Sequence, residues 1–85
     1  MKYFGKYRGL VINPNDPEER SRLLIKVPSM GDMELGWAEG VFPSSFAALP
    51  TNYTVLPERE DFVWVEFEQG DIQRPLWTGI MWKKK

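Results

Sequence analysis

The sequence predicts an all-β domain built as a small, closed barrel of five strands that are mostly antiparallel. Three observations favour this fold. Short runs of β-branched and aromatic residues alternate between two faces, seven prolines and seven glycines separate these runs, and no long stretch has the period of a helix. Because the chain has only 85 residues, we expect one domain that spans residues 1–85.

The first strand is predicted at residues 3–13, in the run YFGKYRGLVIN. Gly5 and Gly9 interrupt this run, and each would cost a helix about 1 kcal/mol relative to alanine. A strand that bends at glycine accommodates them better. The following segment, NPNDPEERS at 13–21, has the proline, asparagine and aspartate spacing of a loop, with room for one helical turn at 17–20.

The second and third strands are shorter. RLLIKVP at 22–28 places Leu23, Ile25 and Val27 on one face, and Pro28 ends the run. A polar connection at 29–35 leads to GWAEGVF at 36–42, which Pro43 closes. These two runs therefore predict two further strands.

The segment from residue 43 to 57 has no sustained period. An irregular connection of this length inside a small domain usually has a function or forms an interface. We therefore expect contacts with a neighbouring protein from this segment.

The clearest local prediction is a β-hairpin at 62–82. DFVWVEFEQ alternates Val63, Val65 and Phe67 with an opposite face that begins at Phe62 and Trp64. RPLWTGIMW alternates in the same way, and a glycine-containing polar turn lies between the two runs. We expect the hairpin to close the barrel, with the two valines and Phe67 facing inward.

Five antiparallel strands must either close on themselves or leave exposed edges. A five-stranded barrel of the OB type solves this problem, and an SH3-like barrel is the nearest alternative. The fold class predicted from the sequence is thus all-β, a small five-stranded antiparallel OB-fold barrel.

The composition excludes several kinds of chemistry. With no cysteine there are no disulfides and no cysteine-ligated zinc, and with no histidine the commonest general base and metal ligand are absent. A net charge of −1 argues against a non-specific nucleic-acid binder, which normally carries a basic excess. No apolar run approaches the roughly 18 residues of a membrane span, so we expect no stable membrane insertion by this chain.

The sequence gives only weak evidence for catalytic residues. Glu66 and Glu68 share one strand face at i, i+2, but a solvated face is the far commoner explanation. Asp16, Glu18 and Glu19 do not have the spacing of an EF-hand loop, and no glycine-rich phosphate loop is present. The sequence predicts no catalytic residue, metal ligand, cofactor or small-molecule substrate.

Aromatic residues are abundant, with four Trp, three Tyr and five Phe. Some must fill the core, and rings beside Lys6 and Arg8 could stack on single-stranded bases. A protein interface is favoured over both, because aromatic residues and arginine are enriched at interfaces. The candidate interface residues are Tyr3, Phe4, Tyr7, Phe46, Tyr53, Trp64, Arg74 and Trp77, with Trp64 and Trp77 expected to point outward.

The order of these motifs resembles a known family, from about Phe4 to Trp82. An N-x-D-P loop, a G-R-V-x-V-x-V-P strand, a Trp and a P-x-x-G-D-x-V-x-V-x-F-E-x-G-D hairpin follow one another. The matching residues are Gly9, Asn15, Asp16, Pro17, Arg22, Leu23, Lys26, Val27, Pro28, Trp37, Pro57, Asp61, Val63, Val65, Phe67, Glu68, Gly70, Asp71, Pro75 and Gly79.

This pattern is similar to the OB-fold domain of phage baseplate spike proteins, including tail lysozymes, and of the valine-glycine-repeat spike proteins of type VI secretion. Two positions depart from it. Ser21 and Glu60 stand where the family usually has glycine, which puts the local backbone of two turns in question.

The resemblance implies a structural, non-enzymatic protein of the virion, in a phage tail baseplate, made in the host bacterial cytoplasm. Family members form homotrimers on the tail axis and connect the hub to a membrane-piercing spike or needle. The chain ends six residues after Gly79, so we expect neither a lysozyme domain nor a β-helical needle in it. The alternatives left open are a single-stranded nucleic-acid-binding OB protein and a small hydrolase that uses Glu66 and Glu68.

Overall fold

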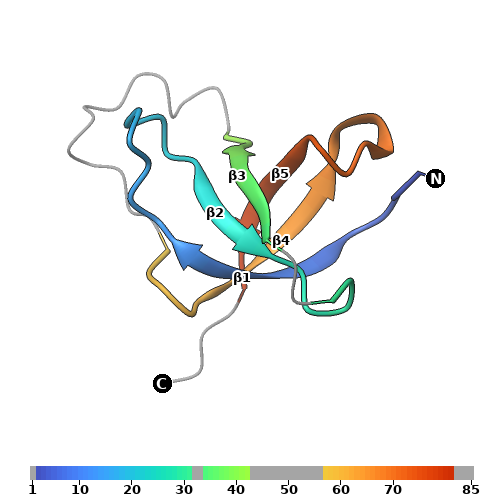
Figure 1. The fold of residues 1–85 in the computed structure, drawn as a ribbon, viewed down its shortest axis with the longest axis horizontal. Coiled ribbons are helices and arrows are strands. Elements are labelled where there is room, and N and C mark those ends of the chain that lie inside the picture. Colours follow the sequence, from blue (N-terminus) through green and yellow to red (C-terminus); the bar gives the residue numbers. More distant parts are fainter. Residues whose placement is uncertain (1, 32–33, 43–56, 82–85) are drawn as a thin grey trace.

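A computed structural model describes residues 2–31, 34–42 and 57–81. The described part contains five strands and one short 3-10 turn, all of which Figure 1 labels except the turn. The strands, in chain order, are β1 (Tyr7–Asn13), β2 (Leu23–Lys26), β3 (Glu34–Gly40), β4 (Phe62–Phe67) and β5 (Pro75–Ile80), with the turn η3 (Glu68–Gly70) between the last two.

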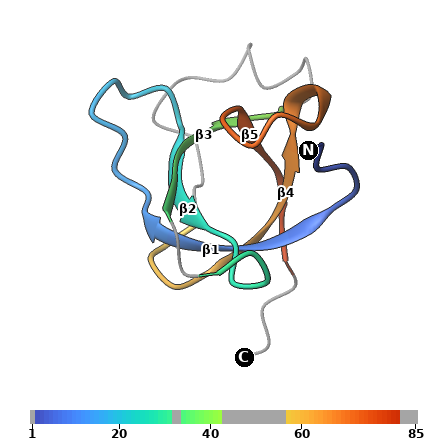
Figure 2. The same cartoon turned by 45° about the vertical axis from the view of Figure 1, so that its right-hand side comes forward.

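The strands form a closed barrel in the order β1-β2-β3-β5-β4, which Figure 2 shows as a ring. Four neighbouring pairs are antiparallel, as predicted, but β3 and β5 are parallel. The reason is geometric, because strand direction cannot alternate all the way round a ring of five. One pair must run the same way, so the mostly antiparallel barrel expected from the sequence contains one parallel pair among the described strands.

The core is built from the inner face of all five strands. Leu23, Ile25 and Val27 are fully buried, and so are Val63 and Val65, which confirms the inward face predicted for the hairpin. Burying a side chain of this size contributes about 1.5–3 kcal/mol. The complete cluster of buried residues is Val11, Leu23, Ile25, Val27, Ala38, Val63, Val65, Phe67 and Trp77.

Two glycines shape β1. Gly5 has a φ of 93°, a left-handed conformation that stops the strand, so β1 begins at Tyr7 rather than at residue 3. Gly9 lies where β1 crosses β4 closely, and a Cβ atom there would be 2.4 Å from Cγ2 of Val65. Only glycine permits this approach without displacing the core.

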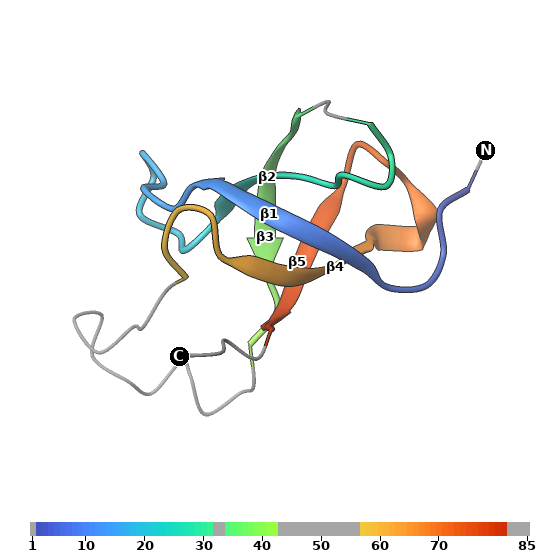
Figure 3. The ribbon, with the colours of Figure 1, turned by 90° about the horizontal axis from the view of Figure 1, so that it is seen from below.

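The two ends of the barrel carry different segments (Figure 3). The loop after β1 lies beside the turn that precedes β4, and Arg59 in that turn donates a hydrogen bond of 2.6 Å to the carbonyl of Ile12. The N-terminal segment and η3 lie together at the other end, where the backbone N–H of Tyr3 donates to the carbonyl of Gly70 at 2.9 Å. Each end is thus tied together by contacts between segments far apart in the sequence.

Candidate docking surfaces

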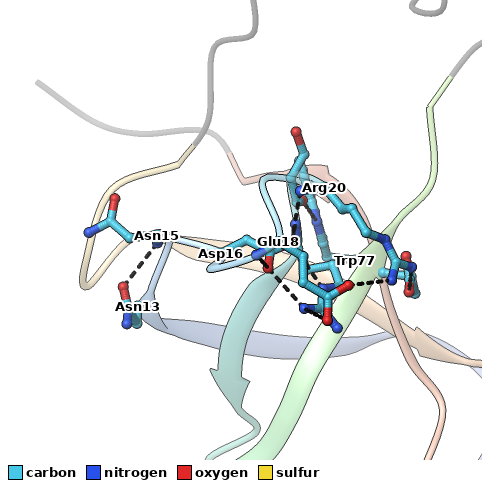
Figure 4. A network of polar contacts seen from close by, with 9 residues as sticks. Asn13, Asn15, Asp16, Glu18, Arg20 and Trp77 are labelled. Atoms are coloured by element: carbon cyan, nitrogen blue, oxygen red, sulfur yellow. Dashed lines mark hydrogen bonds and ion pairs between the residues drawn. The ribbon is translucent and has the colours of Figure 1, made fainter. Parts of the chain in front are cut away.

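The loop between β1 and β2 is organised around Asp16 (Figure 4). Its carboxylate accepts hydrogen bonds from the backbone N–H groups of Glu18, Arg20 and Arg22, at 2.8, 3.0 and 3.2 Å. Prolines on both sides of Asn15 and Asp16 prevent a regular helix or strand, and the aspartate side chain supplies the acceptor that such a backbone lacks. The sequence therefore folds this loop around a single side chain.

Arg22 pairs with the same carboxylate through a two-pronged contact. Its Nε donates to Oδ2 and its Nη2 to Oδ1 of Asp16, both at 2.9 Å, and the Asp16 side chain is only 2% exposed. This geometry is the stronger form of an ion pair. The hydrogen bond from Arg22 holds the pKa of Asp16 well below its usual range; burial opposes this effect, and the backbone N–H groups reinforce it.

Two further contacts join the loop to β3. Arg20 pairs with Glu18 at 3.0 Å and with Glu39 of β3. The guanidinium of Arg22 lies over the ring of Trp37, with Cζ 5.7 Å from the ring centroid. The structure therefore brings three of the motif residues, Asp16, Arg22 and Trp37, into one network that fastens the loop to the barrel.

Trp77 lies in the core, so the prediction that it points outward is wrong. It is 4% exposed, its Nε1 donates a hydrogen bond of 3.0 Å to the carbonyl of Ser21, and its ring meets Phe42 edge-on at 5.4 Å. Trp77 is paired with the inward Val65, next to an irregularity in the β4–β5 register. Both faces of β5 carry apolar residues, so alternation alone could not show which face was inner.

The two positions that depart from the family pattern keep a glycine-like backbone. Ser21 has a φ of 60° and Glu60 a φ of 70°, both in the left-handed region. A residue other than glycine is strained there, by about 1 kcal/mol. Both turns therefore have the positive φ that glycine adopts without strain.

The N-terminal aromatic residues pack against one end of the barrel. Tyr3 and Tyr7 contact the ring of Phe67, with centroids 6.0 and 5.4 Å apart, and the Tyr7 hydroxyl donates to the carbonyl of Phe4 at 3.0 Å. Phe4 itself is 70% exposed. Of these three interface candidates, Phe4 is the one that presents most of its ring to solvent.

The remaining interface candidates are Arg74, Phe46 and Tyr53. Arg74 is exposed, but it forms ion pairs with Glu68 at 3.8 Å and with Asp71 at 3.7 Å. Phe46 and Tyr53 lie outside the described residues. The charged group of Arg74 thus already has partners in and beside the η3 turn.

Glu66 and Glu68, considered above as a catalytic pair, form ion pairs with different residues. Glu66 lies on β4 and pairs with Lys6 at 3.4 Å, whereas Glu68 lies beyond the strand in η3 and pairs with Arg74. They therefore do not share a strand face as expected. Across residues 2–31, 34–42 and 57–81, no group of three or more acidic residues is arranged to hold a metal ion.

An outer surface of the barrel gathers Arg8, Leu10, Phe62 and Trp64, and we call it the β1–β4 face. The strand register sets Arg8 beside Trp64 and Leu10 beside Phe62. The guanidinium of Arg8 lies over Trp64, with Cζ 5.7 Å from the ring centroid, and Phe62 is 43% exposed. Trp64 was predicted to face outward and is only half-buried, but Phe62 was not among the candidates, although the same alternation places it on this face.

The arrangement of the strands defines a class of protein. A closed five-stranded barrel in the order β1-β2-β3-β5-β4, sealed by a parallel β3–β5 pair, is an OB-type barrel. No helix in the part of the chain that the structure describes could cross a lipid bilayer. The exposed apolar residues are candidate docking surfaces on this closed barrel.

The particular family follows from comparison with known families. The model of the OB domain from type VI secretion system and phage-baseplate injectors matches residues 7–82, and the chain belongs to this family. No curated protein matches the chain. The family is a structural baseplate and spike domain, which agrees with the resemblance noted from the sequence.

Proposed function

We propose that this chain is a non-enzymatic spike or hub module of a phage tail baseplate or a related contractile injection machine. It docks to hub and spike proteins on the tail axis and supports membrane penetration by holding the spike in place. The observation that carries the proposal is the family match over residues 7–82, which covers every strand of the barrel.

The surface of the barrel supports a docking role. Phe4, Val41, Phe62 and Ile80 are 70, 49, 43 and 49% exposed, so four large apolar side chains of the described residues reach the surface. Where such side chains lie side by side, as Phe62 does with Leu10, they can form a site of protein contact. A closed barrel with a buried core suits a module that holds its partner proteins in a fixed arrangement rather than one that changes conformation.

The proposed assembly is a homotrimer. A small domain gains stability by burying aromatic rings between copies, and closed cyclic symmetry does so without leaving a growing edge. The protein would be made in the cytoplasm of the host bacterium and then built into the virion or the secretion machine. The trimer and these partners are inferences from the family, and the exposed apolar residues are compatible with both.

Co-expression tests this function directly. The chain is expressed with the hub and spike proteins of the same machine, and the complexes are analysed by size-exclusion chromatography with light scattering. We expect a stable complex with a threefold stoichiometry of this chain. The proposal would be contradicted if the chain remained a monomer at high concentration and bound neither protein.

A further inference from the structure

Arg8 differs from the other arginines of the chain. Arg20 and Arg22 donate hydrogen bonds to carboxylates, Arg59 donates to a carbonyl, and Arg74 forms ion pairs. Arg8, in contrast, has no ion pair or hydrogen bond from its guanidinium within the described residues. A guanidinium carries five N–H donors in a planar fork. Arg8 therefore presents an unsatisfied, fork-shaped set of donors on the β1–β4 face.

The guanidinium is also held in position. It lies over the ring of Trp64, 5.7 Å from the centroid, and Trp64 is paired with Gly79 across the β4–β5 register. A Cβ atom at Gly79 would be 3.9 Å from Cδ1 of Trp64, so the indole lies beside the β5 backbone at this point. An arginine restrained in this way loses less rotamer freedom when a partner binds.

Apolar surface lies directly beside the arginine. Phe62 is 43% exposed and is paired with the half-buried Leu10, two residues along each strand from Trp64 and Arg8. Arginine and tryptophan flanked by apolar contacts are the residues that most often dominate binding energy at interfaces. The β1–β4 face has this composition, with a cation at one side of an apolar patch.

We propose that the β1–β4 face docks a protein partner that presents a carboxylate to Arg8 and an aliphatic patch to Phe62 and Leu10. The inference rests on the proposed function, since it names the surface by which the module meets its hub or spike protein. Charge complementarity selects the carboxylate, because it is the anionic group of a protein side chain whose two oxygens match the fork of an unpaired guanidinium.

Two other occupants fit less well. A second copy placed on the face by a two-fold axis would bring two Arg8 cations together, because a two-fold interface pairs the same surface with itself. In the proposed trimer this face would instead meet a different surface of the next copy, and the self-association measurement below detects that arrangement. Nucleic acid would need several free cations, but the neighbouring Lys6 is already paired with Glu66, 3.4 Å away. The face therefore offers one free cation beside apolar rings, which suits a protein.

The test measures binding of the purified hub protein and the purified spike protein of the same machine to immobilised wild-type chain and variants. We expect Arg8→Ala and Phe62→Ser to weaken binding of one of these proteins at least about tenfold. Arg8→Lys should also weaken it, because an ammonium lacks the planar fork. Arg20→Ala is the matched control, since this exposed arginine is already paired with Glu18 and Glu39 and is not an interface candidate, and we expect the affinity of this variant to remain within about twofold.

Circular dichroism and thermal unfolding of each variant establish that the barrel is folded. If the wild-type chain binds a partner and Arg8→Ala and Phe62→Ser bind it equally well, the inference fails while the proposed function stands. If the wild-type chain binds neither hub nor spike, both fail. Two other results would overturn the inference, because each would assign the face to a different occupant. One is self-association that depends on concentration and is lost in Arg8→Ala, and the other is binding of labelled single-stranded DNA that is lost in Arg8→Ala.

Discussion

The indole Nε1 of Trp77 donates a hydrogen bond of 3.0 Å to the backbone carbonyl of Ser21, 56 residues earlier in the chain. This contact joins the centre of β5 to the last residue before Arg22, whose side chain completes the Asp16 network. The core and the β1–β2 loop are therefore one structural unit, and a substitution in either should alter the packing of the other.

Replacing Trp77 with phenylalanine should destabilise the barrel by about 2–3 kcal/mol. The smaller ring leaves a cavity in the core and removes the donor to the Ser21 carbonyl. Urea unfolding followed by circular dichroism measures the free energy of unfolding. Trp64→Phe on the outer face is the control and should cost less than about 1 kcal/mol; equal losses at the two positions would contradict the inward placement of Trp77.

Glycine should stabilise the two turns that depart from the family pattern. Ser21→Gly and Glu60→Gly relieve a left-handed backbone, at φ 60° and 70°, and each should raise the free energy of unfolding by about 0.5–1 kcal/mol. The control is Ser29→Gly, at an exposed position that lacks a positive φ, where glycine should give no gain. Thermal unfolding curves of the three variants make the comparison, and a loss of stability at Ser21 or Glu60 would refute the strain.

Gly9 and Gly79 should respond differently to alanine. At Gly9 the added Cβ would be 2.4 Å from Cγ2 of Val65, inside the core, so Gly9→Ala should cost about 1–3 kcal/mol. At Gly79 the nearest atom would be 3.9 Å away, an ordinary contact, so Gly79→Ala should change stability by less than about 0.5 kcal/mol. Chemical denaturation of both variants measures the change in the free energy of unfolding. If Gly9→Ala unfolded at the same denaturant midpoint as the wild-type chain, the predicted clash with Val65 would be contradicted.

The Asp16–Arg22 pair should make the barrel sensitive to acid. The folded pKa of Asp16 lies well below the value of about 3.9 expected in the unfolded chain, so below about pH 5 the unfolded state takes up a proton that the folded state does not. The stabilisation is full above the unfolded pKa and is lost as pH falls through the folded pKa. The melting temperature of the wild-type chain should therefore fall with acidification.

Asp16→Asn isolates this contribution. The variant should melt several degrees below the wild-type chain at pH 7, because the largely buried Arg22 loses its buried charged partner and keeps only the exposed Glu18. The difference should narrow as the pH falls below about 4. Glu19→Gln removes an exposed carboxylate from the same loop and serves as the control. A difference in melting temperature between wild type and Asp16→Asn that stayed constant from pH 7 to pH 3 would argue against this linkage.

Much of the fold could be predicted because its strands have one strictly apolar face. Alternation in the second strand and in β4 placed Leu23, Ile25, Val63 and Val65 inward correctly. The order of turn residues and strands is specific enough to indicate the family from the amino-acid sequence alone. Local pattern was sufficient wherever one face of a strand was clearly more apolar than the other.

The docking face could be predicted only in part. Trp64 was identified from alternation, but its contact with Arg8 depends on the register between β1 and β4, which pairs residues 56 positions apart. Trp77 was misplaced because apolar residues occupy both faces of β5, and its burial follows from pairing with Val65. Information of this kind lies in the relation between strands rather than within any one of them.

The parallel contact between β3 and β5 has a mechanical consequence. It is held by two register pairs, Glu39 with Leu76 and Gly40 with Trp77, whereas β4 and β5 share five. A force that pulls β3 away from β5 therefore meets the shortest ladder among the described strands of the ring. Load applied along the β1–β4–β5 side would be carried by the longer ladders, so that side is the stronger point of attachment for the proposed role in a contractile machine.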